Sequence, residues 1–99
     1  MNININAVKF KTDKKLEEFI QEKLSKLSTI HDGIIGSDVT LRLDSNEKTQ
    51  NKIAEIRLVI RGNDLFAKKE TKSFEESVDS AIDALKKQIA KHKEKIKGI

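Results

Sequence analysis

The stretch "IAEIRLVIRG", residues 53–62, alternates apolar side chains with mostly charged ones and decides the fold. Successive side chains of a strand point to opposite faces of a sheet, so this period of two predicts a strand. Its apolar face consists of Ala54, Ile56, Leu58 and Ile60. Its other face carries Glu55, Arg57, Val59 and Arg61. Because only one face is apolar, we expect other elements to cover only one face of the sheet.

Three further segments have the same character. The stretch "DVTLRLD", residues 38–44, alternates and predicts the preceding strand, while the polar "SNEKTQNK", residues 45–52, predicts a long loop between the two. After the turn "GND", "LFAKKET" at residues 65–71 predicts a more polar strand at an edge of the sheet. The N-terminal "MNININAVKF" alternates asparagine with isoleucine and alanine, and predicts the first strand.

Two stretches carry apolar residues at helical spacing. The first is "TDKKLEEFIQEKLSKL", residues 12–27, in which Thr12 or Asp13 is the predicted N-cap. The glycine-containing link "STIHDGIIGS", residues 28–37, is expected to end this helix.

The last helix is predicted to open at Ser73, which has capping-box spacing to Glu76. Its apolar stripe consists of Phe74, Val78, Ala81, Ile82, Leu85, Ile89 and Ile96.

The resulting order β-α-β-β-β-α predicts an α+β fold in one domain, residues 1–99. A right-handed crossover places the first strand parallel to the second, and two hairpins then give an antiparallel remainder with strand order 1-2-3-4. Both helices must pack on the single apolar face of the sheet.

Composition excludes several classes of function. The chain has no cysteine, and therefore no disulfide framework, thiolate metal site or cysteine nucleophile. No apolar run approaches the length of a membrane span, and the N-terminus lacks the layout of a signal peptide, so we expect a cytoplasmic protein. The 20 basic residues exceed the 16 acidic ones by only four, so the distribution of charge is more informative than its sum.

No arrangement predicts an enzyme, a metal site or a cofactor. His31 and His92 lie in different elements, and His92 falls near the apolar stripe, so a packed histidine is favoured over a zinc ligand. Asp79 and Asp83 are four residues apart and could form an acid/base pair. Their place near the start of a helix, where negative charge suits the dipole, is the favoured explanation.

Lysines dominate the end of the chain, with six of them and one acid, Glu94, between Lys86 and Lys97. Favourable interaction with the helix dipole explains Lys95 and Lys97, but the effect fades within the last turn. The steps Lys87/Lys91, Lys91/Lys95 and Lys93/Lys97 place like charges four apart, at a cost of about 0.2 to 0.5 kcal/mol each. Binding to a polyanion would reverse that sign, because neutralised phosphates release counterions, and we favour it over a merely solvated face.

Other surfaces give weaker signals. Lys23 and Lys26 flank the apolar stripe of the first helix, where packing of their methylenes on the core and a binding role are equally plausible. The bare sheet face has several cations but only Phe66 as a stacking aromatic, which disfavours sequence-specific RNA recognition. Attachment to a membrane is disfavoured because the core needs the apolar stripe of the last helix.

The chain resembles the bacterial ribosome hibernation promoting factors, a family that includes the ribosome-associated translation inhibitors and was once described as sigma-factor modulation proteins. The residues that carry the resemblance in the last helix are Asp79, Asp83, Leu85, Lys87, Gln88, Lys91, His92 and Lys93. In the first helix Lys23 and Lys26, ahead of Leu27, match the basic positions of the family. The likeness covers the whole chain, as a short-form member.

The resemblance implies a protein that is not an enzyme and that binds the small ribosomal subunit when growth slows. It would occupy the decoding channel through ribosomal RNA and block initiation, with no membrane or small-molecule partner. The phosphate-contacting cations would be Lys23, Lys26, Lys86, Lys87, Lys91 and Lys93. Gln88 and His92 would be hydrogen-bonding partners.

Two departures from the family pattern stand out. Glu17 occupies a position where some relatives carry arginine, and Lys69 one where a small inward residue is usual. The resemblance also leaves open whether ribosomes are paired or silenced singly, because the chain stops soon after the last helix.

Two alternatives remain. A general double-stranded RNA-binding module would also use shape and phosphate contacts. A protein-interaction module that acts on a transcription factor would not depend on the last-helix lysines.

Overall fold

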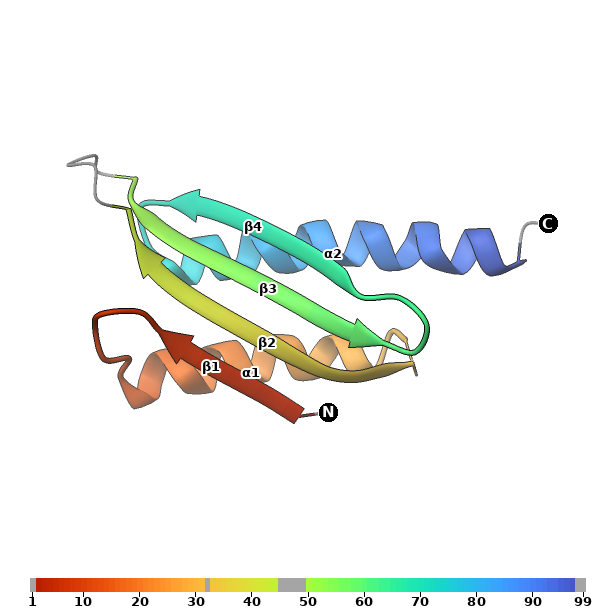
Figure 1. Cartoon of the computed structure of the whole chain (residues 1–99), viewed down its shortest axis with the longest axis horizontal. Helices are drawn as coiled ribbons and strands as arrows, with labels where there is room; N and C mark the ends of the chain where they lie inside the picture. Colours follow the sequence, from red (N-terminus) through yellow and green to blue (C-terminus); the bar gives the residue numbers. More distant parts are fainter. Residues whose placement is uncertain (1, 32, 45–49, 98–99) are drawn as a thin grey trace.

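The alternating segments build one four-stranded sheet, flanked by two helices in the predicted β-α-β-β-β-α order (Figure 1). The computed structural model describes residues 2–31, 33–44 and 50–97, with side chains described as far as Lys91. The elements are β1 (Asn2–Ala7), α1 (Lys14–Ser28), β2 (Ile34–Leu43), β3 (Lys52–Ile60), β4 (Leu65–Thr71) and α2 (Phe74–Lys97).

The sheet has the order β1-β2-β3-β4, with β1 parallel to β2 and the other pairs antiparallel, which confirms the predicted topology. The register aligns the apolar positions across all four strands, and one inward-facing row runs through Ile5, Val39, Ile56 and Ala67. The turn from β3 to β4 uses Gly62 at a φ of 86°, a backbone conformation that glycine adopts without steric cost.

The start of β2 differs from the sequence-based expectation. The strand begins at Ile34, whereas residues 28–37 had the character of a glycine-containing link. Gly36 is a site of close approach inside the strand, since a Cβ there would lie 3.0 Å from the main-chain oxygen of Asn2. A bulge between Ile34 and Gly36 shifts the register to β3 at this point. The predicted loop at residues 45–52 falls mostly on residues 45–49, outside the described part of the chain.

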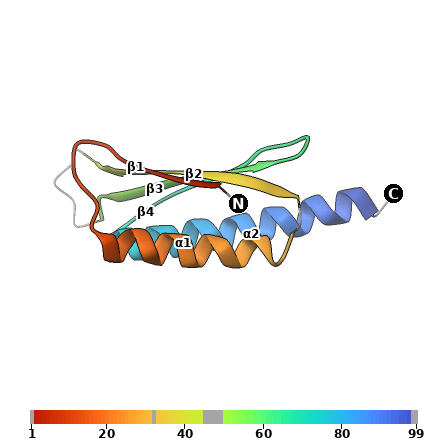
Figure 2. The same ribbon diagram turned by 90° about the horizontal axis from the view of Figure 1, so that it is seen from below.

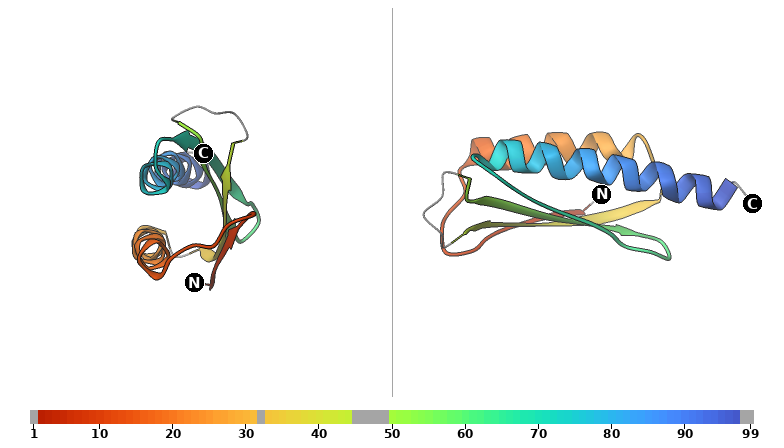
Figure 3. Two further views of the ribbon diagram at one scale, coloured as in Figure 1. Left: turned by 90° about the vertical axis from the view of Figure 1, so that its left-hand side faces the viewer. Right: turned by 90° about the horizontal axis from the view of Figure 1, so that it is seen from above.

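Both helices lie on the same face of the sheet and run parallel to each other, which confirms the predicted layering (Figure 2 and Figure 3). α1 ends at Ser28, but α2 continues past the end of α1 and past the sheet (Figure 1). The molecule is therefore elongated, with extents of 47 × 24 × 18 Å. No helix in the described residues is long and apolar enough to cross a membrane.

The helix starts follow the predicted caps. The Asp13 carboxylate accepts a hydrogen bond from the Leu16 amide at 2.7 Å, which identifies Asp13 as the N-cap of α1. The Ser73 hydroxyl accepts from the Glu76 amide at 3.1 Å, as the first half of a capping box does. The Ser73 amide itself donates to the hydroxyl of Thr71 at 3.3 Å, so Thr71 takes the place that Glu76 has in the predicted capping box.

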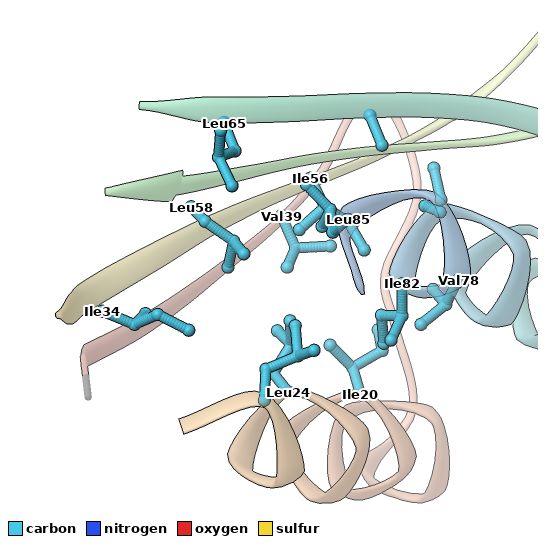
Figure 4. Close-up of a cluster of buried hydrophobic side chains, with 14 of the residues drawn as sticks. Ile20, Leu24, Ile34, Val39, Ile56, Leu58, Leu65, Val78, Ile82 and Leu85 are labelled. Atoms are coloured by element: carbon cyan, nitrogen blue, oxygen red, sulfur yellow. The ribbon is translucent and has the colours of Figure 1, made fainter. Parts of the chain in front are cut away.

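Aliphatic side chains from both helices meet the inward face of the sheet in one core (Figure 4). The fully or almost fully buried members include Ile20, Leu24, Val39, Ile56, Leu58, Val78, Ile82 and Leu85. Each large aliphatic side chain contributes about 1.5 to 3 kcal/mol by its removal from water. The first turns of α2 are held further by Ser77, which is fully buried and donates to the main-chain oxygen of Lys52 at 2.6 Å.

Candidate nucleic-acid interface

The charges of α2 are divided between its two halves. The first half carries Glu75, Glu76, Asp79 and Asp83 and no base, and the second carries the lysine-rich segment from Lys86 onward. An anionic ligand is therefore repelled from the first half of α2 and attracted to its second half, which still packs on the sheet through Gln88 and Ile89 before the helix continues past the sheet (Figure 2). The helical side of the molecule is therefore acidic near the start of α2 and basic toward its end.

Lys86, Lys87 and Lys91, the α2 lysine cluster, are exposed. None of the three lies within 4.0 Å of a carboxylate oxygen in the described residues, although Asp83 precedes Lys87 by one helical turn. Lys87 and Lys91 are four residues apart and thus neighbours on the helix surface. The cluster concentrates positive charge that the rest of the described chain does not neutralise.

The α1 lysines, Lys23 and Lys26, are in a different situation. The Lys23 ammonium lies 3.3 Å from a carboxylate oxygen of Asp79 on α2 and 5.6 Å from the centre of the Phe19 ring. The Lys26 ammonium lies 4.0 Å from a carboxylate oxygen of Glu22, one turn earlier on α1. Both predicted cations are thus on the helical side of the molecule, but each has an acidic partner within it.

The pair between Lys23 and Asp79 links the two helices. It gives Asp79 a structural partner on the neighbouring helix. The side chains are 37% and 50% exposed, so the pair is worth at most about 1 kcal/mol and can be exchanged for another partner.

Gln88 contributes to the fold. Its amide donates to the main-chain oxygen of Phe66 in β4 at 2.9 Å, which fixes α2 against that strand. In the free protein this side chain is therefore already engaged and half-buried. The side chains of His92 and Lys93, the remaining predicted site residues, lie outside the described part of α2.

The outward face of the sheet, opposite the helices, is largely self-neutralising. Arg57 lies opposite Asp38 on one side and Phe66 on the other, and Arg42 forms an ion pair with Glu55. Phe66 is 49% exposed and is the aromatic that sequence analysis placed on this face. Cross-strand pairs of opposite sign offset one another, so this face should attract a phosphate backbone less strongly than the α2 lysine cluster does.

The departure at Glu17 also has a local explanation. Its carboxylate accepts a hydrogen bond from the Thr12 hydroxyl at 2.6 Å, so it ties the start of α1 to the preceding loop. Lys69 is exposed, although it lies opposite the buried Ala54 on the inward-facing register of β4. Within the described residues, no three histidine or acidic side chains are grouped so as to hold a metal ion.

Sequence reasoning missed three contacts that organise this side of the molecule. These are the ion pair from Lys23 to Asp79, the hydrogen bond from Gln88 to β4, and the anchoring of Ser77 on β3. A serine inside an apolar helical stripe is a signal that could have indicated the last of them. The other two depend on distances between elements, which periodicity does not report.

Comparisons with known proteins agree with the fold and give the family. Residues 3–97 match the family model described as "Sigma 54 modulation protein / S30EA ribosomal protein". A ribosome hibernation promoting factor from Pseudomonas putida is 30% identical over 95 residues, which are 96% of this chain and 89% of that protein. The protein of the same name from Escherichia coli K12 is 29% identical over 97 residues, 98% of each chain.

Two solved structures have the same fold. A ribosomal subunit interface protein from Coxiella burnetii superposes with a TM-score of 0.83 at 22% identity, over 94% of this chain and 98% of that one. The N-terminal domain of Protein Y from Thermus thermophilus superposes with a TM-score of 0.80 at 22% identity, over 93% and 99%.

Proposed function

Because the chain belongs to the Sigma 54 modulation protein / S30EA ribosomal protein family, we propose that it binds the small ribosomal subunit and silences it. The family is one of ribosome hibernation factors, which are not enzymes. The chain would act in the cytoplasm, docked in the decoding channel through ribosomal RNA, and would block initiation while growth is slow.

The observation that carries this proposal is the α2 lysine cluster. Its three lysines are exposed, have no acidic partner within the described residues, and lie in the second half of α2. Each lysine that neutralises a phosphate releases condensed counterions, which favours binding in proportion to the number of contacts. The repulsion that the cluster costs in the free protein is offset in an RNA-lined channel.

The proposed mechanism is occlusion. A helix about 36 Å long at 1.5 Å per residue can follow a groove of phosphates without reading bases. The outward sheet face, with its offset charges and single exposed phenylalanine, gives no stacking platform for specific recognition. Once seated, the protein would exclude messenger and transfer RNA by volume.

The experiment is cosedimentation of the protein with purified small subunits. Lys87→Gln/Lys91→Gln should lose most of its binding at physiological salt, and its remaining affinity should fall less steeply with salt than that of the parent chain. The matched control is Lys68→Gln/Lys69→Gln, which removes the same charge from two adjacent exposed lysines of β4 and should bind like the parent chain. Undiminished binding of the α2 variant would contradict the proposed contact surface.

The same variants distinguish the two alternatives. A general duplex-binding module should shift free double-stranded RNA at moderate salt, whereas an occluding factor should need assembled subunits. A modulator of a transcription factor should bind its partner equally well before and after the α2 lysines are neutralised.

A further inference from the structure

The two edges of the sheet are protected to different degrees. At one edge, β4 carries Lys68, Lys69 and Glu70, and α2 lies against it and donates a hydrogen bond from Gln88 to its backbone. Charged residues and a covering helix are the usual ways to keep an edge strand from pairing with another chain. At the other edge, β1 has the sequence "NININA" with no charge and no proline. β1 therefore lacks the features that protect β4.

The backbone groups at the free edge of β1 can be identified. The Val8 amide donates to the main-chain oxygen of Leu41 at 3.0 Å and continues the β1–β2 ladder. Because alternate residues of a strand direct their amide and carbonyl groups to the same side, the even-numbered residues of β1 face β2. The amide and carbonyl groups of Ile3, Ile5 and Ala7 thus point to the free edge. Their side chains face the core, yet they are only half-buried.

Residues 2–6 read Asn-Ile-Asn-Ile-Asn, which is the same in both directions. We propose that β1 pairs with β1 of a second copy of this chain, antiparallel, about a two-fold axis at Asn4. A two-fold axis needs a surface that complements itself, and a palindromic strand supplies one. Asn4 then lies opposite Asn4 of the second copy, each Ile3 opposite an Ile5, and each Asn2 opposite an Asn6.

The hydrogen-bonding pattern fits this register. Ile3 and Ile5 would form the hydrogen-bonded pairs, because their free amide and carbonyl groups face outward, and Asn4 would form the closer, non-hydrogen-bonded pair. The half-buried Ile3 and Ile5 side chains would be covered further by their counterparts. No charge approaches its like at the axis, which matters for a chain whose net charge is +4.

The axis is perpendicular to the sheet, so both helix layers remain on one side of a continuous eight-stranded sheet. α2 packs over β3 and β4, away from the axis, and the α2 lysine cluster of each copy stays exposed. The pairing is thus independent of the proposed binding to the small subunit. A contact limited to one six-residue strand falls well below the roughly 1,000 Å² of a stable interface, so the dimer should be weak and form at high concentration.

The test uses Asn4→Cys in a chain that has no other cysteine. Cα atoms of a non-hydrogen-bonded pair lie about 4.5 Å apart, within the range that a disulfide spans. Mild oxidation should therefore convert most of the protein to a covalent dimer. The matched control, Lys68→Cys on the protected edge, should give at most a small fraction. Equal crosslinking of the two variants, or crosslinking of Asn4→Cys that persists undiminished in denaturant, would overturn the proposal.

A second variant tests the reversible dimer without a thiol. Asn4→Lys places one lysine of each copy at the axis, where the two would face each other. The variant should still fold, because Asp38, which accepts a hydrogen bond from Asn4 at 3.1 Å, can accept one from a lysine at this position. Sedimentation velocity should show a concentration-dependent dimer for the parent chain and only monomer for this variant. A parent chain that stays monomeric at millimolar concentration would overturn the proposal, whether or not subunit binding is found.

Discussion

The lysines of α1 and those of α2 lie on the same side of the sheet, but they differ in what neutralises them. Lys23 and Lys26 each have a carboxylate within 4.0 Å, whereas the α2 lysine cluster has none in the described residues. Both sets are basic and solvent-accessible, so composition alone does not separate them. The difference teaches that lysines of similar exposure are not equally available to an anionic ligand, because internal carboxylates pair with one set and not with the other in the described residues.

The energies of the two sets explain why this matters for binding. To contact a phosphate, Lys23 must first leave Asp79, and the departing carboxylate then remains nearby as a repulsive neighbour. Lys87 and Lys91 have no acidic partner within the described residues, and their mutual repulsion falls when a phosphate approaches. We therefore expect α2 to supply most of the electrostatic free energy of binding.

The largest expected effect follows directly from this comparison. Lys86→Gln/Lys87→Gln/Lys91→Gln should lower affinity for the small subunit about a hundredfold at physiological salt, since each lost phosphate contact removes about 0.7 to 0.9 from the salt slope. Lys23→Gln/Lys26→Gln should lower it by no more than about tenfold. Titration of the small subunit at several salt concentrations gives the affinity and the salt slope of each variant. An equal loss of affinity per lysine in the two helices would show that internal pairing does not decide which lysines contribute to binding.

Most of the fold could be predicted because it depends on local periodicity. The alternation of β3 and the stripes of α1 and α2 set the faces, and the handedness of the crossover then leaves one topology. The start of β2 could not be predicted, because a glycine such as Gly36 is typical of turns, whereas here it allows β2 to approach β1 closely. That role exists only when the neighbouring strand is in place.

The candidate site was predictable to a lesser degree. Helical spacing correctly places Lys86, Lys87 and Lys91 at exposed positions. It gives no information on the contact from Gln88 to β4 or on that from Lys23 to Asp79, since both need the separation of two elements. Charge patterns along one helix therefore indicate candidates, and the packing of that helix decides which of them are available.

Gln88 lies in the same half of α2 as the lysine cluster, but its side chain is bound to β4. Gln88→Ala should lower the free energy of unfolding by about 0.5 to 1.5 kcal/mol, because the main-chain oxygen of Phe66 loses its donor. Affinity of the folded variant for the small subunit should not change, since the amide faces β4. Chemical denaturation and a binding titration measure the two effects. A variant of normal stability that binds poorly would show that Gln88 turns to RNA in the complex.

Asp79→Asn tests whether the ion pair with Asp79 keeps Lys23 from contributing to binding of the small subunit. The change releases Lys23 and removes a negative charge, so affinity for the small subunit should rise about threefold to fivefold. The free energy of unfolding should fall by no more than about 1 kcal/mol, because the pair is largely exposed. Asp83→Asn is the control, since it removes the same charge from α2 and Asp83 forms no ion pair with another residue whose side chain the structure describes. If both variants bind alike, release of Lys23 contributes nothing.

The smallest effect concerns the free protein and has opposite signs in the two helices. Lys26→Gln removes an attraction to Glu22, which stabilises a helix by about 0.2 to 0.5 kcal/mol, and should lower the melting temperature by about 1 to 3 °C. Lys91→Gln relieves the like-charge step to Lys87 and should raise the melting temperature by a similar amount. Both differences should shrink at high salt, because the charges are exposed. A loss of stability in Lys91→Gln would mean that its charge already has a partner in the free chain, and the α2 lysine cluster would then be no different from the lysines of α1.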